Sequence, residues 1–184
     1  MTARDALIEA TRTLLSTQGY EATSPGEIQR TSGVGQGSFY HHFNSKADLA
    51  AAALASLADD MCAEFDLLAS GAQTDVIAAY LGLPRDALAG CRIGRICMES
   101  SLADARIQEP IGRYFLHLRN RLAVAFEALD TSIDAGALAD LAIASVQGAY
   151  VTARATRDPS TMTRATTALL ALLNNSIERG NDEP

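Results

Sequence analysis

The chain of 184 residues has a single lysine, no tryptophan and only 5% aromatic residues. It also has no apolar run that approaches the ~18 residues needed by a membrane-spanning helix. Its first residues lead directly into an amphipathic pattern, and not into the apolar core of a signal peptide. These absences predict a cytoplasmic protein without a membrane partner.

Cysteine is also scarce, and the three cysteines are Cys62, Cys91 and Cys97. An odd number without a C-x-x-C pair predicts neither a disulfide framework nor a zinc site. We therefore expect no metal and no cofactor. The main interpretation is that the three thiols are small apolar groups in a reduced compartment. A redox role for Cys91 and Cys97 is the alternative.

Acidic residues outnumber basic ones, 22 to 15, so the net charge is −7. This balance argues against a protein that coats nucleic acid without preference. Residues 1–50 are closer to neutral, with Arg4, Arg12, Arg30 and Lys46 as their cations. Any DNA binding by this region must therefore depend on individually placed contacts and on dimerisation.

The composition favours packed helices, because 48% of the residues are hydrophobic and many of these are Ala or Leu. Apolar spacing predicts a helix over residues 4–18 that ends at Gly19. The sequence Ser24-Pro25-Gly26-Glu27 then has the pattern of a capping box, with proline at the first helical position. In that pattern the Glu27 carboxylate reaches back to the Ser24 amide. A short helix is expected from Pro25 to about Thr31.

A helix-turn-helix follows from the next residues. Gly33 suits a tight turn, and Val34 after it is expected to enter the core. A second short helix is predicted over residues 36–42, with Phe39 and Phe43 as its apolar anchors. Ser45 then has the position of a cap for a long helix that begins at Lys46 and continues to about residue 69.

Residues 4–50 resemble the DNA-binding head of the TetR (tetracycline repressor) family of transcriptional regulators. The matching positions are Thr23-Ser24, Ile28, Gly33-Val34, Gly37-Ser38, Tyr40, His42-Phe43 and Lys46-x-x-Leu49. The sequence departs from the family pattern at Gly26, Gln29, Gly35 and Gln36. These departures remove positive charge and one helix cap.

The resemblance implies a surface that contacts double-stranded DNA. Its expected members are Thr23 or Ser24, Gln36, Gly37, Ser38, Tyr40, His41, His42 and Lys46. Gln36 and Gly37 would face base edges, since a glutamine amide can both donate to and accept from adenine. Hydroxyl groups and the lysine ammonium would contact phosphates, with the two histidines beside them.

The remainder of the chain is predicted to be helical as well, over residues 75–81, 110–129, 135–157 and 159–179. Pro110 is expected to open the second of these helices. The last two have faces rich in small residues and leucine, which suit a four-helix bundle with a second copy of the chain. The resemblance also favours a homodimer. In the alternative, these faces serve the internal core alone.

A small-molecule effector is expected to bind within this body, in an apolar cavity with few polar groups. The residues expected to line it are Phe65, Tyr80, Met98, Tyr114, Phe115, His117, Gln147 and Tyr150. Each of them could instead be an ordinary core residue.

Together these features predict an all-α protein of two domains. A three-helix DNA-binding head (1–46) is joined through a long fourth helix to a ligand-binding and dimerisation domain (47–184). The expected function is a ligand-responsive dimeric regulator, with repression favoured and activation left open. One alternative is a helical interaction module without DNA binding. The other is an enzyme, although the sequence has no H-E-x-x-H, P-loop or G-x-S-x-G motif.

Overall fold

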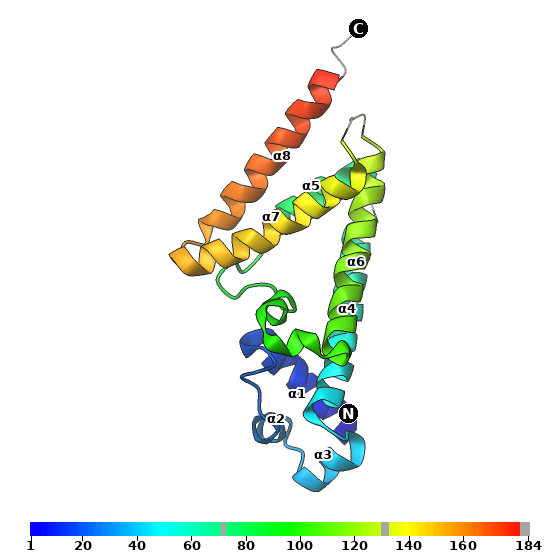
Figure 1. Cartoon of the computed structure of the whole chain (residues 1–184), viewed down its shortest axis with the longest axis vertical. Helices are drawn as coiled ribbons and strands as arrows, with labels where there is room; N and C mark the ends of the chain where they lie inside the picture. Colours follow the sequence, from blue (N-terminus) through cyan, green and yellow to red (C-terminus); the bar gives the residue numbers. More distant parts are fainter. Residues whose placement is uncertain (71–72, 130–132, 181–184) are drawn as a thin grey trace. The chain divides into compact units, whose positions relative to one another are not determined.

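The computed structural model of the chain describes residues 1–70, 73–129 and 133–180. Within these ranges every regular element is a helix, as Figure 1 shows. The elements are α1 (Ala3–Gln18), α2 (Pro25–Ser32), α3 (Gln36–His42), α4 (Lys46–Leu68), α5 (Gln73–Gly82), η1 (Gly94–Met98), η2 (Ser100–Ala103), α6 (Ala105–Glu127), α7 (Ala135–Thr156) and α8 (Ser160–Gly180). The prediction of an all-α fold is confirmed.

The chain packs as two compact units, and each is described here by itself. Unit 1 comprises residues 1–61 and 91–114, and unit 2 comprises residues 62–90 and 115–184. Helices α4 and α6 contribute residues to both units. The predicted boundary after residue 46 separates a DNA-binding domain from a ligand-binding domain. The two packing units do not test this functional division, which stays a prediction.

One hydrophobic cluster in the core of unit 1 is formed by α1, α2, α3 and the beginning of α4. Its buried members are Leu7, Leu14, Ile28, Phe39, Phe43 and Leu49. The side chain of Val34, which follows the turn, packs against this cluster. The predicted core positions of Val34, Phe39 and Phe43 are therefore confirmed, and Ile28 of α2 packs with them. They attach the second and third helices to the first and fourth.

The ends of α2 are fixed by local chemistry. The Ser24 hydroxyl accepts a hydrogen bond from the Glu27 amide at 3.2 Å, and Pro25 occupies the first turn. The Glu27 carboxylate departs from the expected capping box, because it accepts from Gln18 Nε2 at 2.9 Å. Gly33 ends the helix with φ +70°, a left-handed conformation that favours glycine.

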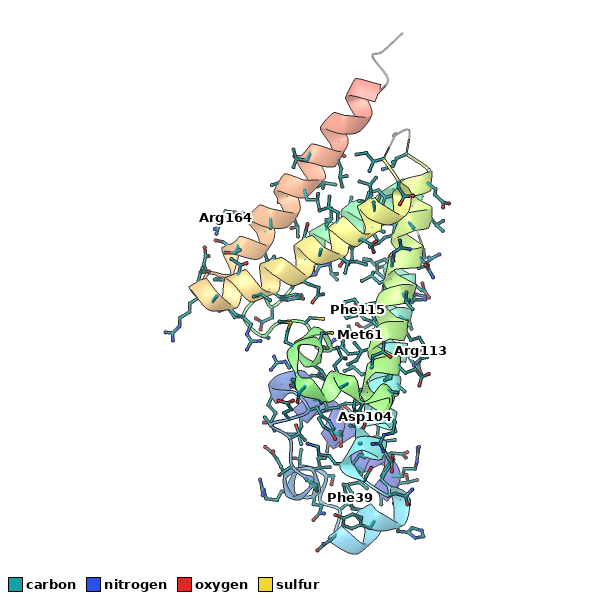
Figure 2. The ribbon with its side chains drawn as sticks, in the orientation of Figure 1. Phe39, Met61, Asp104, Arg113, Phe115 and Arg164 are labelled. Atoms are coloured by element: carbon teal, nitrogen blue, oxygen red, sulfur yellow. The ribbon has the colours of Figure 1, made fainter. Side chains whose placement is uncertain are left out.

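The segment before α6 differs from the prediction. Residues 94–103 form two short 3₁₀ helices, and α6 already begins at Ala105. Asp104, labelled in Figure 2, starts the helix by accepting from the Arg106 amide at 3.0 Å. Pro110 therefore lies inside α6 and does not open it. The buried side chains of Ile107, Pro110 and Ile111 offset the backbone hydrogen bond that a proline removes.

Unit 2 is built around α7 and α8, which pack against each other, and α5 packs against α8. In Figure 1 these two long helices are coloured yellow and orange to red. Asp134 caps α7 by accepting from the Ala137 amide at 2.8 Å. Asp158 does the same for α8 through the Ser160 amide at 3.0 Å. The buried face of α7 consists mainly of alanine, which allows close helix packing.

Candidate nucleic-acid interface

Helix α3 separates an apolar anchor from an exposed polar face. Phe39, labelled in Figure 2, is the buried residue of the helix and is 0% exposed. Tyr40 beside it is 52% exposed, although its ring makes an edge contact with the Phe39 ring at 5.0 Å between centroids. Gln36, His41 and His42 are exposed as well. The side chains expected to face DNA are thus presented to solvent by a helix that is anchored from behind.

The first turn of α3 has no side-chain cap and carries few bulky side chains. Gly35 occupies the N-cap position and supplies no side-chain hydrogen bond. A Cβ atom added at Gly37 would meet nothing within 4 Å, so this residue leaves open space in front of the backbone. Ser38 is half-buried on the same turn. A flat surface could therefore approach the backbone here more closely than at the other turns of the helix.

Of the pair Thr23 and Ser24, the structure leaves only Ser24 accessible. Thr23 is 2% exposed, and its hydroxyl donates to the Gly19 carbonyl at 2.6 Å. The same hydroxyl accepts from Gln18 Nε2 at 3.3 Å. The Thr23 hydroxyl is therefore engaged within the loop, and its predicted phosphate contact stays a prediction. Ser24 is exposed at the start of α2.

Lys46, which was expected to contact phosphate, makes hydrogen bonds within the chain. Its ammonium donates to the Tyr20 carbonyl at 2.9 Å and to the Thr23 carbonyl at 2.8 Å. It also lies 3.8 Å from the centroid of the Tyr20 ring. Burial lowers the pKa of Lys46, whereas the carboxylates of Glu99 and Glu21 oppose this shift. Two of the three N–H groups therefore hold the loop between α1 and α2.

Two arginines of the head are exposed and were not among the predicted contacts. Arg4 stacks over the Phe43 ring at 5.5 Å from its centroid. Arg30, on α2, makes no ion pair within the described part of the chain. Arg30 faces outward because Ile28 faces inward, and a residue two positions further along a helix lies on nearly the opposite face. Arg12 is instead paired with Asp60 of α4.

The eight residues expected around an effector are divided between the two units. Met98 and Tyr114 belong to unit 1 and the other six to unit 2. Met98 is 86% exposed, so it lines no enclosed cavity within its unit. In unit 2, the buried rings of Phe65 and Tyr80 make an edge contact at 5.9 Å.

The remaining expected pocket residues of unit 2 are less buried. The His117 ring lies 3.0 Å from Asp66, through Nε2 and Oδ1. Phe115, Gln147 and Tyr150 are half-buried. His117 therefore already has an acidic partner in the folded chain.

A separate hollow of about 380 Å³ lies between α4 and α6 in unit 1. Its lining residues are Ala51, Ala55, Arg106, Glu109, Pro110 and Arg113. None of them is an expected pocket residue, and both guanidinium groups are already paired. Arg106 binds Asp48 and Asp104, and Arg113 binds Asp59.

Within the described ranges, no group of three or more His, Cys, Asp or Glu side chains is arranged to hold a metal ion. No helix there combines the length and apolar character needed to cross a membrane.

Comparisons with known proteins agree with the geometry of the head. Residues 7–53 match the family model "Bacterial regulatory proteins, tetR family". Residues 73–168 match "Transcriptional regulator LmrA/YxaF-like, C-terminal domain". A curated relative is the HTH-type transcriptional regulator BetI of Rhizobium meliloti (strain 1021). It is 28% identical over 156 residues, which are 80% of this chain and 76% of that protein.

Solved structures share the fold at lower sequence identity. A TetR transcriptional regulator of Chloroflexus aurantiacus J-10-FL has a TM-score of 0.85 at 24% identity, covering 95% of this chain and 96% of that one. The reduced form of NemR of E. coli has a TM-score of 0.81 at 23% identity, covering 91% and 95%. The second family match alone extends over more than half of the sequence. The chain belongs to the TetR family of DNA-binding transcriptional regulators, with an LmrA/YxaF-like C-terminal domain.

Proposed function

We propose that this regulator is a repressor that binds a palindromic operator as a homodimer and is released by a small-molecule effector. The exposed polar face of α3, anchored through Phe39, is the main support for sequence-preferring binding. Members of this family are regulators and not enzymes. The protein would act in the cytoplasm, where its operator is accessible.

The contacts divide into base reading and phosphate binding. Gln36, at the open first turn of α3, would read a base edge together with the backbone at Gly37. Ser24, Ser38 and Tyr40 carry hydroxyl groups suited to phosphate oxygens. Arg4 and Arg30 are accessible cations for the same purpose. His41 and His42, which are exposed on α3, would flank the hydroxyl contacts. Because these contacts are few, the operator affinity would depend on two heads binding together.

The exposed face of α7 supports the homodimer. Its apolar residues recur at alternating intervals of four and three, as in the seam of paired helices. They are Ala137, Leu141, Ala144, Gly148, Val151 and Ala155, and all are exposed in the single chain. The alanines and Gly148 among them would allow the α7 helices of two copies to approach closely, with α8 completing a four-helix bundle. The two recognition helices would then read half-sites about 34–36 Å apart.

Effector release follows from linkage. A ligand that binds better to a dimer with the wrong head spacing lowers operator affinity by the ratio of its two affinities. Phe115 and Tyr150, half-buried in unit 2, remain proposed effector contacts. Titration of Phe115→Ala and Tyr150→Ala with an identified effector tests them, and unchanged affinity in both would remove them from the site.

The DNA interface is tested with operator sequences selected from a random duplex library. Tyr40→Phe keeps the ring contact with Phe39 but removes the hydroxyl, so we expect binding to weaken about three- to tenfold for every sequence. Gln36→Ala should instead change which bases are selected. Fluorescence anisotropy measures the first effect, and sequencing of the selected pool measures the second.

Two results would contradict the proposal. If the wild type selects no preferred sequence, the chain is not an operator-binding regulator of this kind. If Gln36→Ala selects the same bases as the wild type, Gln36 does not read a base. Gln29→Ala is the matched control, since this half-buried glutamine lies on α2 and was not assigned to the interface.

A further inference from the structure

Glu99, outside the DNA-binding head, holds the loop that leads into the helix-turn-helix. One oxygen of its carboxylate, Oε2, accepts from the backbone amides of Tyr20 and Glu21, both at 3.0 Å. The Ser101 hydroxyl donates to the same oxygen at 3.2 Å. Glu99 lies between the two 3₁₀ helices, in the part of the sequence that matches the C-terminal domain. All of these groups belong to unit 1.

Gly19 leaves the space that this carboxylate occupies. A Cβ atom added at Gly19 would lie 1.9 Å from Glu99 Oε1 and 3.0 Å from its Cδ. Gly19 also has a backbone φ of +89°, which residues other than glycine rarely adopt. The glycine at the end of α1 therefore serves two purposes: it turns the chain and it admits the carboxylate.

Neighbouring groups make the attachment reciprocal. Glu21 Oε1 accepts from the Ser100 hydroxyl at 2.6 Å and from the Ser101 amide at 3.3 Å. The Ser100 hydrogen bond is the main reason that the pKa of Glu21 is lowered. Arg95 donates to the Thr17 carbonyl at the end of α1. Residues 94–103 thus hold the loop and the end of α1 that precedes it.

The loop is held from two sides by opposite charges. Its amides at residues 20 and 21 bind the Glu99 carboxylate, while its carbonyls at residues 20 and 23 bind the Lys46 ammonium. Consecutive backbone amides make a favourable site for an anion. This loop ends at Ser24, the N-cap of α2, and α2 shares its core with α3 through Ile28 and Phe39. A change in the loop would therefore move α2 and, through that core, α3.

We propose that Glu99 is a positioning residue for DNA binding. It fixes the loop of residues 19–23, and therefore α2 and α3, without touching DNA itself. Through Glu99, the segment 94–103 of the C-terminal domain controls whether the recognition helix has its binding position. The inference rests on DNA binding alone and does not depend on repression, dimerisation or an effector.

The first test measures operator affinity at several salt concentrations for Glu99→Ala and Glu99→Gln. We expect Glu99→Ala to weaken binding about tenfold, because two backbone amides lose a charged acceptor. Glu99→Gln keeps one acceptor oxygen, so we expect a smaller loss of about threefold. The slope of affinity against salt should stay at the wild-type value, since no phosphate contact is removed.

Glu109→Gln is the matched control. It removes the same charge from an exposed residue of unit 1. Because removing a negative charge by itself favours DNA, this control should bind as tightly as the wild type or slightly more tightly. If both Glu99 variants bind like Glu109→Gln while the wild type binds its operator, the positioning role is wrong. If the wild type binds no operator, the proposed function fails instead.

A second measurement does not use DNA. Hydrogen exchange of the amides of Tyr20 and Glu21 should accelerate in Glu99→Ala and less in Glu99→Gln. A double-mutant cycle with Gly19→Ala should show coupling, because the added methyl group no longer meets a carboxylate once Glu99 is alanine. Wild-type exchange rates at both amides, or additive effects of Gly19→Ala and Glu99→Ala on unfolding, would overturn the inference.

Discussion

At the scale of single residues, the contacts of Lys46 lie within the DNA-binding head. Its ammonium closes the loop between α1 and α2 through two carbonyl oxygens and the Tyr20 ring. Hydrogen bonds to a charged donor contribute more than neutral ones. The side chain therefore acts mainly on the shape of the head.

We predict that Lys46→Met lowers the free energy of unfolding by about 1–2 kcal/mol, because it keeps the aliphatic stem but removes the ammonium. Operator binding should weaken, while its salt slope stays unchanged. Arg30→Met is the comparison, and it should leave the melting temperature unchanged but lower the slope by about one. Thermal melts and salt-dependent anisotropy measure both quantities. A slope lowered by one in Lys46→Met would return Lys46 to the set of phosphate contacts.

The sequence predicted which side of α3 is exposed, because Phe39 and Phe43 define its inner face. It did not predict the partners of Lys46 or the role of Glu99. Glu99 meets amides 78 and 79 residues away in the chain. A local pattern shows a helix end or an apolar face, but it does not show which distant backbone groups fold against a side chain.

At the scale of elements, helix starts were predicted well where the prediction used a side-chain cap as its signal. Ser24 and Ser45 are such caps, and the helices begin where they indicate. The predicted start of α6 was wrong. The prediction used Pro110 as the first helical residue, whereas Asp104, six residues earlier, caps the helix. The 3₁₀ helices of residues 94–103 were not predicted, since short helices of this type carry little periodic signal.

The contribution of the Asp158 carboxylate at the start of α8 to stability can be tested by varying the pH. Asp158 accepts from the Ser160 hydroxyl at 2.6 Å and from Arg164 at 2.8 Å, which lowers its pKa from 3.8 to about 2. Arg164 is labelled in Figure 2. A carboxyl with a lowered folded-state pKa stabilises the fold above its unfolded pKa. That contribution is lost as the pH falls toward the folded value.

We therefore predict that Asp158→Asn melts at a lower temperature than the wild type at pH 7. The difference should persist down to about pH 4 and shrink between pH 4 and pH 2. Asparagine can still cap the helix, so the variant isolates the charge. Thermal melts across this range measure the difference, with Glu127→Gln at the exposed end of α6 as control. A difference that does not depend on pH would contradict the assignment.

At the scale of the whole molecule, the proposed homodimer depends on the seam of exposed apolar residues on α7. Gly148 lies in its middle, and a Cβ atom added there meets nothing within 4 Å of the single chain. A substitution at this position therefore leaves the fold of one chain undisturbed. It acts only on a partner that packs against the seam.

We predict that Gly148→Glu converts a dimer into a monomer of 19.4 kDa and weakens operator binding by at least about a hundredfold. Gly148→Ala adds volume without charge and should remain a dimer. Sedimentation analysis gives the mass, and circular dichroism should show the same helical content in all three proteins. A Gly148→Glu protein that sediments like the wild type would place the interface elsewhere.

Because the chain has a single lysine, chemical modification of that lysine can report on the conformation of the head. Amine-reactive reagents can modify only the α-amino group and Lys46 Nζ, because every other cationic side chain apart from histidine is arginine. In the folded head that nitrogen is engaged by two carbonyls and a ring. Its labelling rate therefore measures how often the loop between α1 and α2 opens. The same rate, recorded with and without operator or effector, would follow the head through each state of the regulator.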